Sequence, residues 1–133
     1  MASIRKEIVT RATPADVWDA VRDIGALHTR LVPGFVVATR LEPGARVVTF
    51  ANGMTVREPI VTIDERERRL VWTAVGGSLT HYNAAAHVIA EPDGSSRVVW
   101  SADLLPDEAA RSVEEMMDAG MAAMQGALDR LAS

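Results

Sequence analysis

The sequence predicts an α+β protein in which a seven-stranded, curved antiparallel sheet wraps around a long C-terminal helix. Two short helices are expected after the first strand. Three observations predict this class: apolar residues recur at steps of three and four over residues 106–132, six strand-like segments joined by short turns precede them, and a helix-start signal follows an alternating N-terminal segment. One helix about 10 Å across cannot cover a flat sheet of this width, so the sheet must curl. We expect one domain over residues 1–133.

The N-terminal elements begin with an alternating segment, 3–11, which predicts the first strand. The sequence Thr13-Pro14-Ala15-Asp16 then supplies an N-cap, a proline for the first helical position and an acid in the first turn. This predicts a helix that ends at Gly25. A second short helical segment is expected over 26–32, because Pro33-Gly34 stops it.

The central part of the chain predicts an antiparallel meander. Turn signals separate the segments, and Asn52-Gly53 between apolar runs is a strong hairpin signal. The run Arg66 to Arg69 is interrupted by Glu67 and preceded by acids, so we interpret it as a charged turn rather than a phosphate-binding patch. The expected strands are 35–41, 45–50, 54–63, 69–75, 79–90 and 97–105.

The C-terminal helix is expected to start at Pro106 and to present one apolar face. Four of the six methionines lie on that face, which Gly120 interrupts where a bulkier residue would fill space. The face is either a flexible filler of the core or the wall of a ligand cavity; it could also accept a partner peptide or a second copy of the chain. Its residues are Val113, Met116, Met117, Gly120, Met121, Met124, Leu128 and Leu131.

Composition excludes several classes of function. The chain has no cysteine, which excludes disulfides and thiolate metal sites. A net charge of −4 gives no general reason to bind nucleic acid. No apolar run is long enough for membrane insertion, and the N-terminus lacks the apolar core of a signal peptide, so we expect a cytoplasmic protein.

Strand parity predicts which side chains face the helix. Trp72 and Ala74 share one face of their strand, Tyr82 and Ala84 share one face of the next, and Trp100 lies on the apolar face of the last. These small and large residues beside a methionine-rich helix suit a cavity, but a tightly interdigitated core would use the same residues.

Glu58 breaks the apolar pattern of its strand, because it shares a face with Val56 and Ile60. Three interpretations are open: an ion pair with Arg40 or Arg46 from a neighbouring strand, a twist at Pro59 that turns the carboxylate outward, or a carboxylate that contacts a ligand or transfers a proton, with Tyr82 nearby as a hydrogen-bond donor.

Other chemistry is not indicated. His81 and His87 lie six residues apart in one strand, about 20 Å at 3.4 Å per residue, so they cannot share a metal ion. The sequence has no phosphate-binding glycine motif and no serine with histidine support. We therefore expect no metal and no cofactor.

In this order of elements, the chain resembles the helix-grip fold of the START/Bet v 1-like (SRPBCC) superfamily, particularly its polyketide cyclase/dehydrase-like branch. The resemblance spans the whole chain and implies an internal pocket between sheet and helix for lipids, sterols, hormones or polyketides. The residues that carry it are Thr13-Pro14-Ala15-Asp16-Val17-Trp18, Pro43-Gly44-Ala45-Arg46, Asn52-Gly53, Val56-Arg57-Glu58, Asp64, Arg69-Leu70-Val71-Trp72, His81-Tyr82, Val99-Trp100-Ser101 and Pro106.

The later strands also resemble the plant abscisic-acid receptors. The turn at Asn52-Gly53 is too short to be the gate of those receptors, so hormone-gated partner binding is not implied. By position, the resemblance implies pocket residues at Glu58, Trp72, Ala74, Leu79, Tyr82, Ala84, Met117 and Met121.

The expected function is the binding of a hydrophobic or amphipathic small molecule, such as a lipid, an aromatic or a polyketide-like compound, by a monomer or homodimer. The alternative is a cyclase or dehydratase that uses Glu58 and Tyr82 for acid/base chemistry. The expected ligand-binding residues are Val48, Phe50, Val56, Glu58, Trp72, Ala74, Leu79, Tyr82, Ala84, Trp100, Met117, Met121 and Met124.

Overall fold

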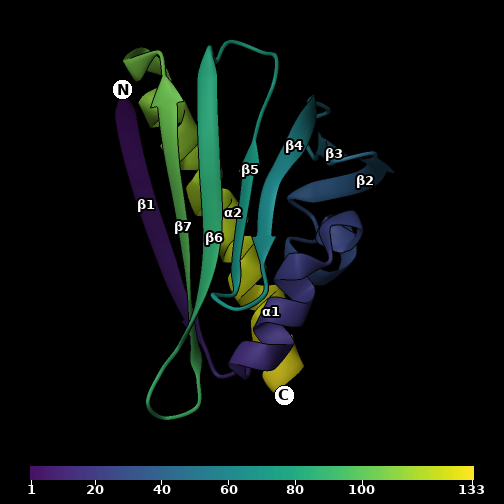
Figure 1. The fold of residues 1–133 in the computed structure, drawn as a ribbon, viewed down its shortest axis with the longest axis vertical. Coiled ribbons are helices and arrows are strands. Elements are labelled where there is room, and N and C mark those ends of the chain that lie inside the picture. The colour runs from purple at the N-terminus through teal and green to yellow at the C-terminus, as the bar shows by residue number, and fades with distance from the viewer.

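The computed structural model describes residues 1–133 and confirms the predicted fold class. Seven antiparallel strands form one curved sheet in the order β1-β7-β6-β5-β4-β3-β2, and the long helix α2 runs along its concave side (Figure 1). The strands are β1 (Ala2–Thr10), β2 (Val36–Glu42), β3 (Ala45–Phe50), β4 (Thr55–Asp64), β5 (Arg69–Thr73), β6 (His81–Ala90) and β7 (Ser96–Leu105). The helices are α1 (Pro14–Arg22), η1 (Ile24–Ala26), η2 (Leu27–Leu31), η3 (Asp107–Ala109) and α2 (Ala110–Ala132).

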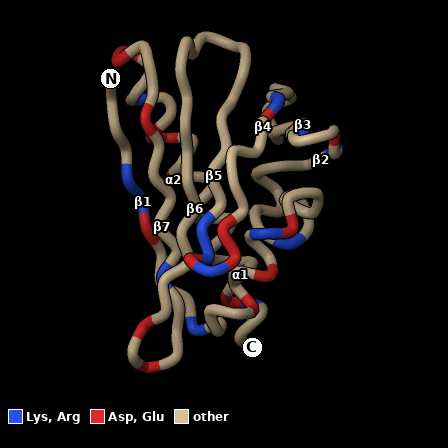
Figure 2. Tube along the Cα trace, in the orientation of Figure 1, with Lys and Arg blue, Asp and Glu red and all other residues tan.

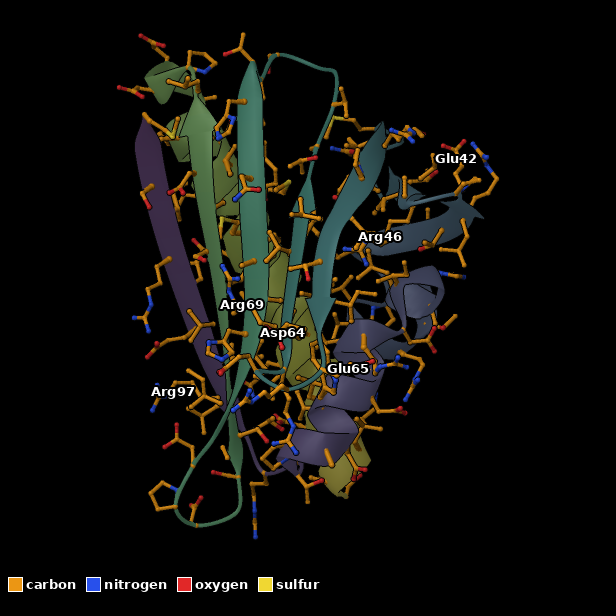
Figure 3. All side chains as sticks on the ribbon, in the orientation of Figure 1. Glu42, Arg46, Asp64, Glu65, Arg69 and Arg97 are labelled. Carbon is orange, nitrogen blue, oxygen red and sulfur yellow. The ribbon has the colours of Figure 1, made fainter.

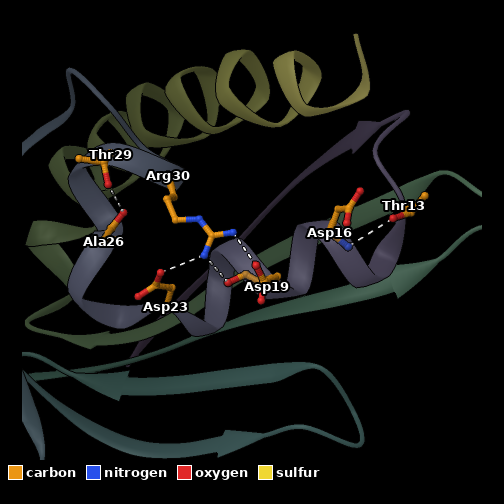
Figure 4. Close-up of polar contacts among 7 residues, drawn as sticks. All are labelled: Thr13, Asp16, Asp19, Asp23, Ala26, Thr29 and Arg30. Carbon is orange, nitrogen blue, oxygen red and sulfur yellow. Dashed lines mark hydrogen bonds and ion pairs between the residues drawn. The ribbon is translucent and has the colours of Figure 1, made fainter.

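The start of α1 confirms the predicted cap. The side chain of Thr13 accepts a hydrogen bond from the backbone N–H of Asp16 at 3.3 Å, and Pro14 occupies the first helical position (Figure 4). The prediction of the helix end was wrong, because α1 stops at Arg22 and Gly25 lies within the 3₁₀ turn η1. The expected second helix is the π-helical segment η2.

Arg30 ties η2 to α1. Its Nη2 lies 2.6 Å from Oδ2 of Asp19, and its Nη1 lies 2.9 Å from Oδ2 of Asp23 (Figure 4). Exposed ion pairs of this kind contribute about 0–1 kcal/mol each, so their main effect is to orient the segment. In this orientation, η2 buries Leu27 and Leu31.

The meander differs from the prediction at one connection. Strand β5 ends at Thr73 and β6 begins at His81, two residues short of the expected bounds on each side. Gly76 and Gly77 have φ angles of +102° and +73°, which L side chains rarely adopt, so the chain leaves the sheet here.

The charged segment between Asp64 and Arg69 forms the predicted turn, which joins β4 to β5. Figure 2 shows that acidic and basic positions are mixed along this turn, next to α1. Glu65 accepts a hydrogen bond from Trp18 Nε1 at 2.7 Å and pairs with Arg22, so this turn fastens α1 to the sheet.

Helix α2 starts at Ala110, after the 3₁₀ turn η3, and not at Pro106 as predicted. One flank is tied to β1: Lys6 Nζ lies 3.0 Å from Asp118 Oδ1, and Gln125 Nε2 donates to the backbone oxygen of Val9 at 2.8 Å. The buried stripe ends at Leu128, because Leu131 is 47% exposed near the helix end.

Candidate functional site

A cavity of about 370 Å³ lies between the sheet, the short N-terminal helices and α2. Its lining is mainly apolar, with 20 hydrophobic residues among 27. The volume falls within the range of roughly 300–1,000 Å³ that is typical of small-molecule sites. Strand parity alone could not distinguish a cavity from an interdigitated core; the structure shows a cavity.

The mouth of the cavity is marked by its exposed lining residues. Asn52 and Met54 come from the turn between β3 and β4, Gly77 and Ser78 from the connection between β5 and β6, and Ser112 from the first turn of α2. The deeper lining residues are buried and come from the strands, from η2 and from α2. The apolar interior is therefore reached past a rim that combines polar side chains with glycines and Met54.

Nine of the thirteen residues expected from the sequence line this cavity. They come from β3 to β7, the β5–β6 connection and α2, which the fold brings together around one space. They are Phe50, Val56, Glu58, Trp72, Ala74, Leu79, Tyr82, Trp100 and Met124. The other four, Val48, Ala84, Met117 and Met121, are buried but do not line it.

The rotation of α2 about its axis explains why Met117 and Met121 do not line the cavity. Met117 and Met121 lie on the flank towards Glu114 and Asp118, which pair with Lys6 of β1, so both pack onto the sheet. The flank that lines the cavity instead carries Val113, Met116 and Met124.

Local packing explains Val48 and Ala84. Thr39, the partner of Val48 on β2, lies 3.1 Å from His28 of η2, so η2 covers this part of β3. Ala84 pairs with Trp72 on one side, and its short side chain is 1% exposed within the core.

The short helices also contribute to the cavity wall, which the sequence pattern did not predict. Val21 of α1 and Leu27 and Leu31 of η2 line the cavity, as does Phe35 just before β2. The helical spacing of these apolar residues was the available signal. It predicts that they are buried, but it does not show whether they face a cavity or a packed core.

Glu58 is buried and paired with Arg46. Arg46 Nε donates to Oε1 of Glu58 at 2.8 Å, and the two residues are direct partners in the β3–β4 register. Figure 3 labels Arg46, which lies beside β3 and β4. Arg40 pairs with Glu42 instead, and Pro59 does not turn Glu58 outward. Arg46 and Glu58 are also the only charged residues that line the cavity.

The surroundings of Glu58 and Tyr82 shift both pKa values. Burial raises the pKa of the Glu58 carboxyl above its ordinary value, although the charge of Arg46 opposes this shift. Burial also raises the pKa of the Tyr82 phenol, the negative charge of Glu58 adds to the effect, and the nearby indole N–H of Trp100 opposes it. Tyr82 therefore stays protonated and can donate a hydrogen bond.

Two indole rings stand next to this ion pair. The guanidinium carbon of Arg46 lies 5.4 Å from the Trp72 ring centroid, and the Trp72 and Trp100 centroids are 6.2 Å apart. Trp100 also occupies the space opposite Gly120, where an added Cβ would come within 2.8 Å of the ring. The expected gap in the helix face is thus filled by an indole.

The same group of residues contains buried donors without acceptors. Arg46 Nη1, Trp72 Nε1 and Trp100 Nε1 are screened from water and have no hydrogen-bond partner. Most buried donors in proteins are paired, so three unpaired ones in a single cluster require an explanation.

Comparison with known proteins places the chain in a family. The model of the family described as "Polyketide cyclase / dehydrase and lipid transport" matches residues 1–133. The chain belongs to this family. No curated protein matches it.

Solved structures share the fold of this polyketide cyclase/dehydrase family member. A solution structure from Thermobifida fusca is 31% identical, with a TM-score of 0.80 over 98% of this chain and 95% of that one. A START superfamily protein from Mycobacterium smegmatis is 11% identical, with a TM-score of 0.77 and coverages of 97% and 98%. Norcoclaurine synthase from Thalictrum flavum is 23% identical, with a TM-score of 0.75 and coverages of 98% and 86%.

Two further findings concern metals and membranes. No group of three or more His, Asp or Glu side chains is arranged to hold a metal ion. None of the helices combines the length and the apolar character that crossing a membrane requires.

Proposed function

We propose that this polyketide cyclase/dehydrase family member binds a hydrophobic or amphipathic small molecule, such as a lipid, an aromatic or a polyketide-like compound, in the internal cavity. The observation that carries the proposal is the cavity of about 370 Å³, whose mainly apolar wall contains one buried ion pair. An apolar ligand body would replace water along this wall, which favours binding by roughly 25 cal/mol per Å² of apolar surface buried.

Glu58 and Tyr82 are proposed to orient the polar end of the ligand. Both line the cavity, and the protonated Tyr82 hydroxyl can donate a hydrogen bond to a ligand oxygen. The apolar body would lie against Val56, Trp72 and Met124. Norcoclaurine synthase, which shares the fold, has been solved with dopamine and hydroxybenzaldehyde, so this architecture can hold small aromatic compounds.

A matched pair of variants tests the proposal. Ala74 lines the cavity, whereas Ala38 is an exposed residue of β2 that does not. Ala74→Phe should fill part of the cavity and weaken binding, and Ala38→Phe should leave binding unchanged. Native mass spectrometry after incubation with lipids, aromatics and polyketides measures both.

Two results would contradict ligand binding in the cavity. Equal binding by the wild type and Ala74→Phe would place the ligand elsewhere. Failure of every compound in the panel to bind the folded wild type would reject the function itself.

The second candidate is a cyclase or dehydratase. The observation that favours it is the raised pKa of Glu58 next to a phenol that its charge influences, because a carboxyl poised nearer neutral pH suits proton transfer. Glu58 would remove or return a proton, and Tyr82 would polarise a carbonyl. Turnover of a polyketide substrate should then fall by about 10²-fold or more in Glu58→Gln, with an unchanged circular dichroism spectrum. Undiminished turnover would remove Glu58 from the mechanism.

A further inference from the structure

The cluster around the ion pair has more donors than acceptors. Arg46, Trp72, Trp100 and Tyr82 all offer N–H or O–H groups, whereas the acceptors are the oxygens of Glu58 and Tyr82. The one hydrogen bond within the cluster joins Arg46 Nε to Glu58 Oε1. Three nitrogens, Arg46 Nη1 and the two indole Nε1 atoms, are left without partners. What the cluster lacks is therefore an acceptor, not another donor.

The three nitrogens belong to residues of the cavity wall. Arg46 is 3% exposed, Trp72 6% and Trp100 8%, so bulk water does not satisfy them. Their side chains lie within one group, since the guanidinium stacks over Trp72 and the two indoles are neighbours. All three residues line the cavity, and a modest shift of their side chains on binding would bring these nitrogens to an oxygen atom of the ligand.

The charge of the cluster selects the kind of oxygen. Arg46 and Glu58 are the only charged residues of the wall, and they neutralise each other at 2.8 Å. A carboxylate on the ligand would bring an uncompensated negative charge into an apolar cavity, which is strongly unfavourable. A carbonyl oxygen accepts the same hydrogen bonds without this cost.

We propose that the ligand presents a neutral carbonyl oxygen to Arg46, Trp72 and Trp100 at the inner end of the cavity. This inference rests on the proposed function and narrows it to ketones, aldehydes, quinones and esters with an apolar body. Hydrocarbons would leave the three donors unpaired. Ligands whose polar end can only donate hydrogen bonds would increase the excess of donors over acceptors.

Binding by three naphthalene compounds tests the class of ligand. Acetylnaphthalene carries a ketone, isopropenylnaphthalene has the same shape with a methylene group in place of the oxygen, and naphthoate carries a carboxylate. If the cavity offered no hydrogen-bond donors, the hydrocarbon would bind more tightly than the ketone, because burying an unpaired carbonyl is unfavourable. If the donors pair with the ligand, the ketone should bind roughly three- to tenfold tighter than the hydrocarbon and tighter than naphthoate at pH 8.

The indole N–H signals of isotope-labelled wild-type protein report the contact directly. Trp18 is an internal reference, because its Nε1 already donates to Glu65 at 2.7 Å outside the cavity. Acetylnaphthalene should move the proton signal of Trp72 or Trp100 downfield and leave that of Trp18 unchanged. Isopropenylnaphthalene should cause no downfield shift.

Phenylalanine variants assign the donors. Trp72→Phe and Trp100→Phe remove an N–H and keep an aromatic ring, so the preference for the ketone should shrink while the hydrocarbon still binds. Trp18→Phe should keep the full preference. The signals of the wild-type protein decide the matter if either cavity variant does not fold.

The outcomes separate this inference from the proposed function. If the hydrocarbon binds as tightly as the ketone, or naphthoate binds tighter, the neutral carbonyl is wrong while ligand binding stands. A ketone preference without any indole shift would contradict these donors. If no compound binds, the inference falls together with the proposed function.

Discussion

Glu58 shows how one residue can combine the interpretations that the sequence kept apart. Its side chain faces inward and pairs with Arg46 across the β3–β4 register, and it also belongs to the wall of the cavity. The ion pair and the place in the candidate site are thus two consequences of one position. Because water is excluded, the carboxylate pays a desolvation cost that a single charged partner does not fully offset.

The raised pKa of Glu58 predicts a specific pH dependence of stability. The folded protein holds this proton more tightly than the unfolded chain, whose value lies near 4.5, so the contribution of Glu58 to the free energy of unfolding decreases as the pH rises above 4.5 through the folded pKa. Compared with Glu58→Gln, which cannot titrate here, the wild type should gain stability as the pH falls from 8 to 4.5. Below 4.5 the difference should level off.

Urea unfolding of both proteins at each pH measures this difference, and the other acids cancel in it. A wild type that loses stability relative to Glu58→Gln over this range would show that Arg46 outweighs burial and lowers the pKa.

At the scale of the element, α2 has two flanks with different tasks. One carries Met117 and Met121 and packs onto the sheet, with polar ties to β1; the other carries Val113, Met116 and Met124 and bounds the cavity. Gly120 lies between Trp100 and the helix axis and allows the indole to approach closely. The close packing of α2 against Trp100 thus requires a glycine at position 120.

The two glycines of α2 predict opposite effects of alanine. At Gly126 a Cβ would meet only Arg130 Nη1 at 3.5 Å, so Gly126→Ala should raise the free energy of unfolding by up to about 1 kcal/mol through helix propensity. At Gly120 the same atom would lie 2.8 Å from Trp100 and 3.1 Å from Phe35. The resulting strain should cost about 1–3 kcal/mol, so Gly120→Ala should be the less stable variant.

Denaturant unfolding measures both glycine variants, and near-ultraviolet circular dichroism reports whether Trp100 has moved. Equal stabilisation by the two alanines would contradict the close packing of Trp100 against α2.

At the scale of the whole molecule, the first strand and the last helix are tied to each other. Strand β1 pairs with β7 along its full length, and α2 is joined to β1 through Lys6 and Gln125. Strands β2 to β5 lie beyond β6 in the sheet (Figure 1). Together with the connections of the meander and η2, they supply most of the mouth and much of the cavity wall. Contacts with β1 therefore hold α2 in place, while β2 to β5 and η2 enclose the cavity next to it.

From the sequence alone came the order of the elements, the face that each buries and nine of the 27 residues that line the cavity, because periods of 2 and 3.6 show which side chains leave water. The folded structure was needed to establish that a cavity exists, that Arg46 rather than Arg40 pairs with Glu58, and that Met117 and Met121 face away from the cavity. These features depend on the curvature of the sheet and on the rotation of α2 about its axis. The periodicity of apolar residues predicts neither the curvature nor the rotation, since a helix rotated slightly towards the sheet has the same sequence pattern.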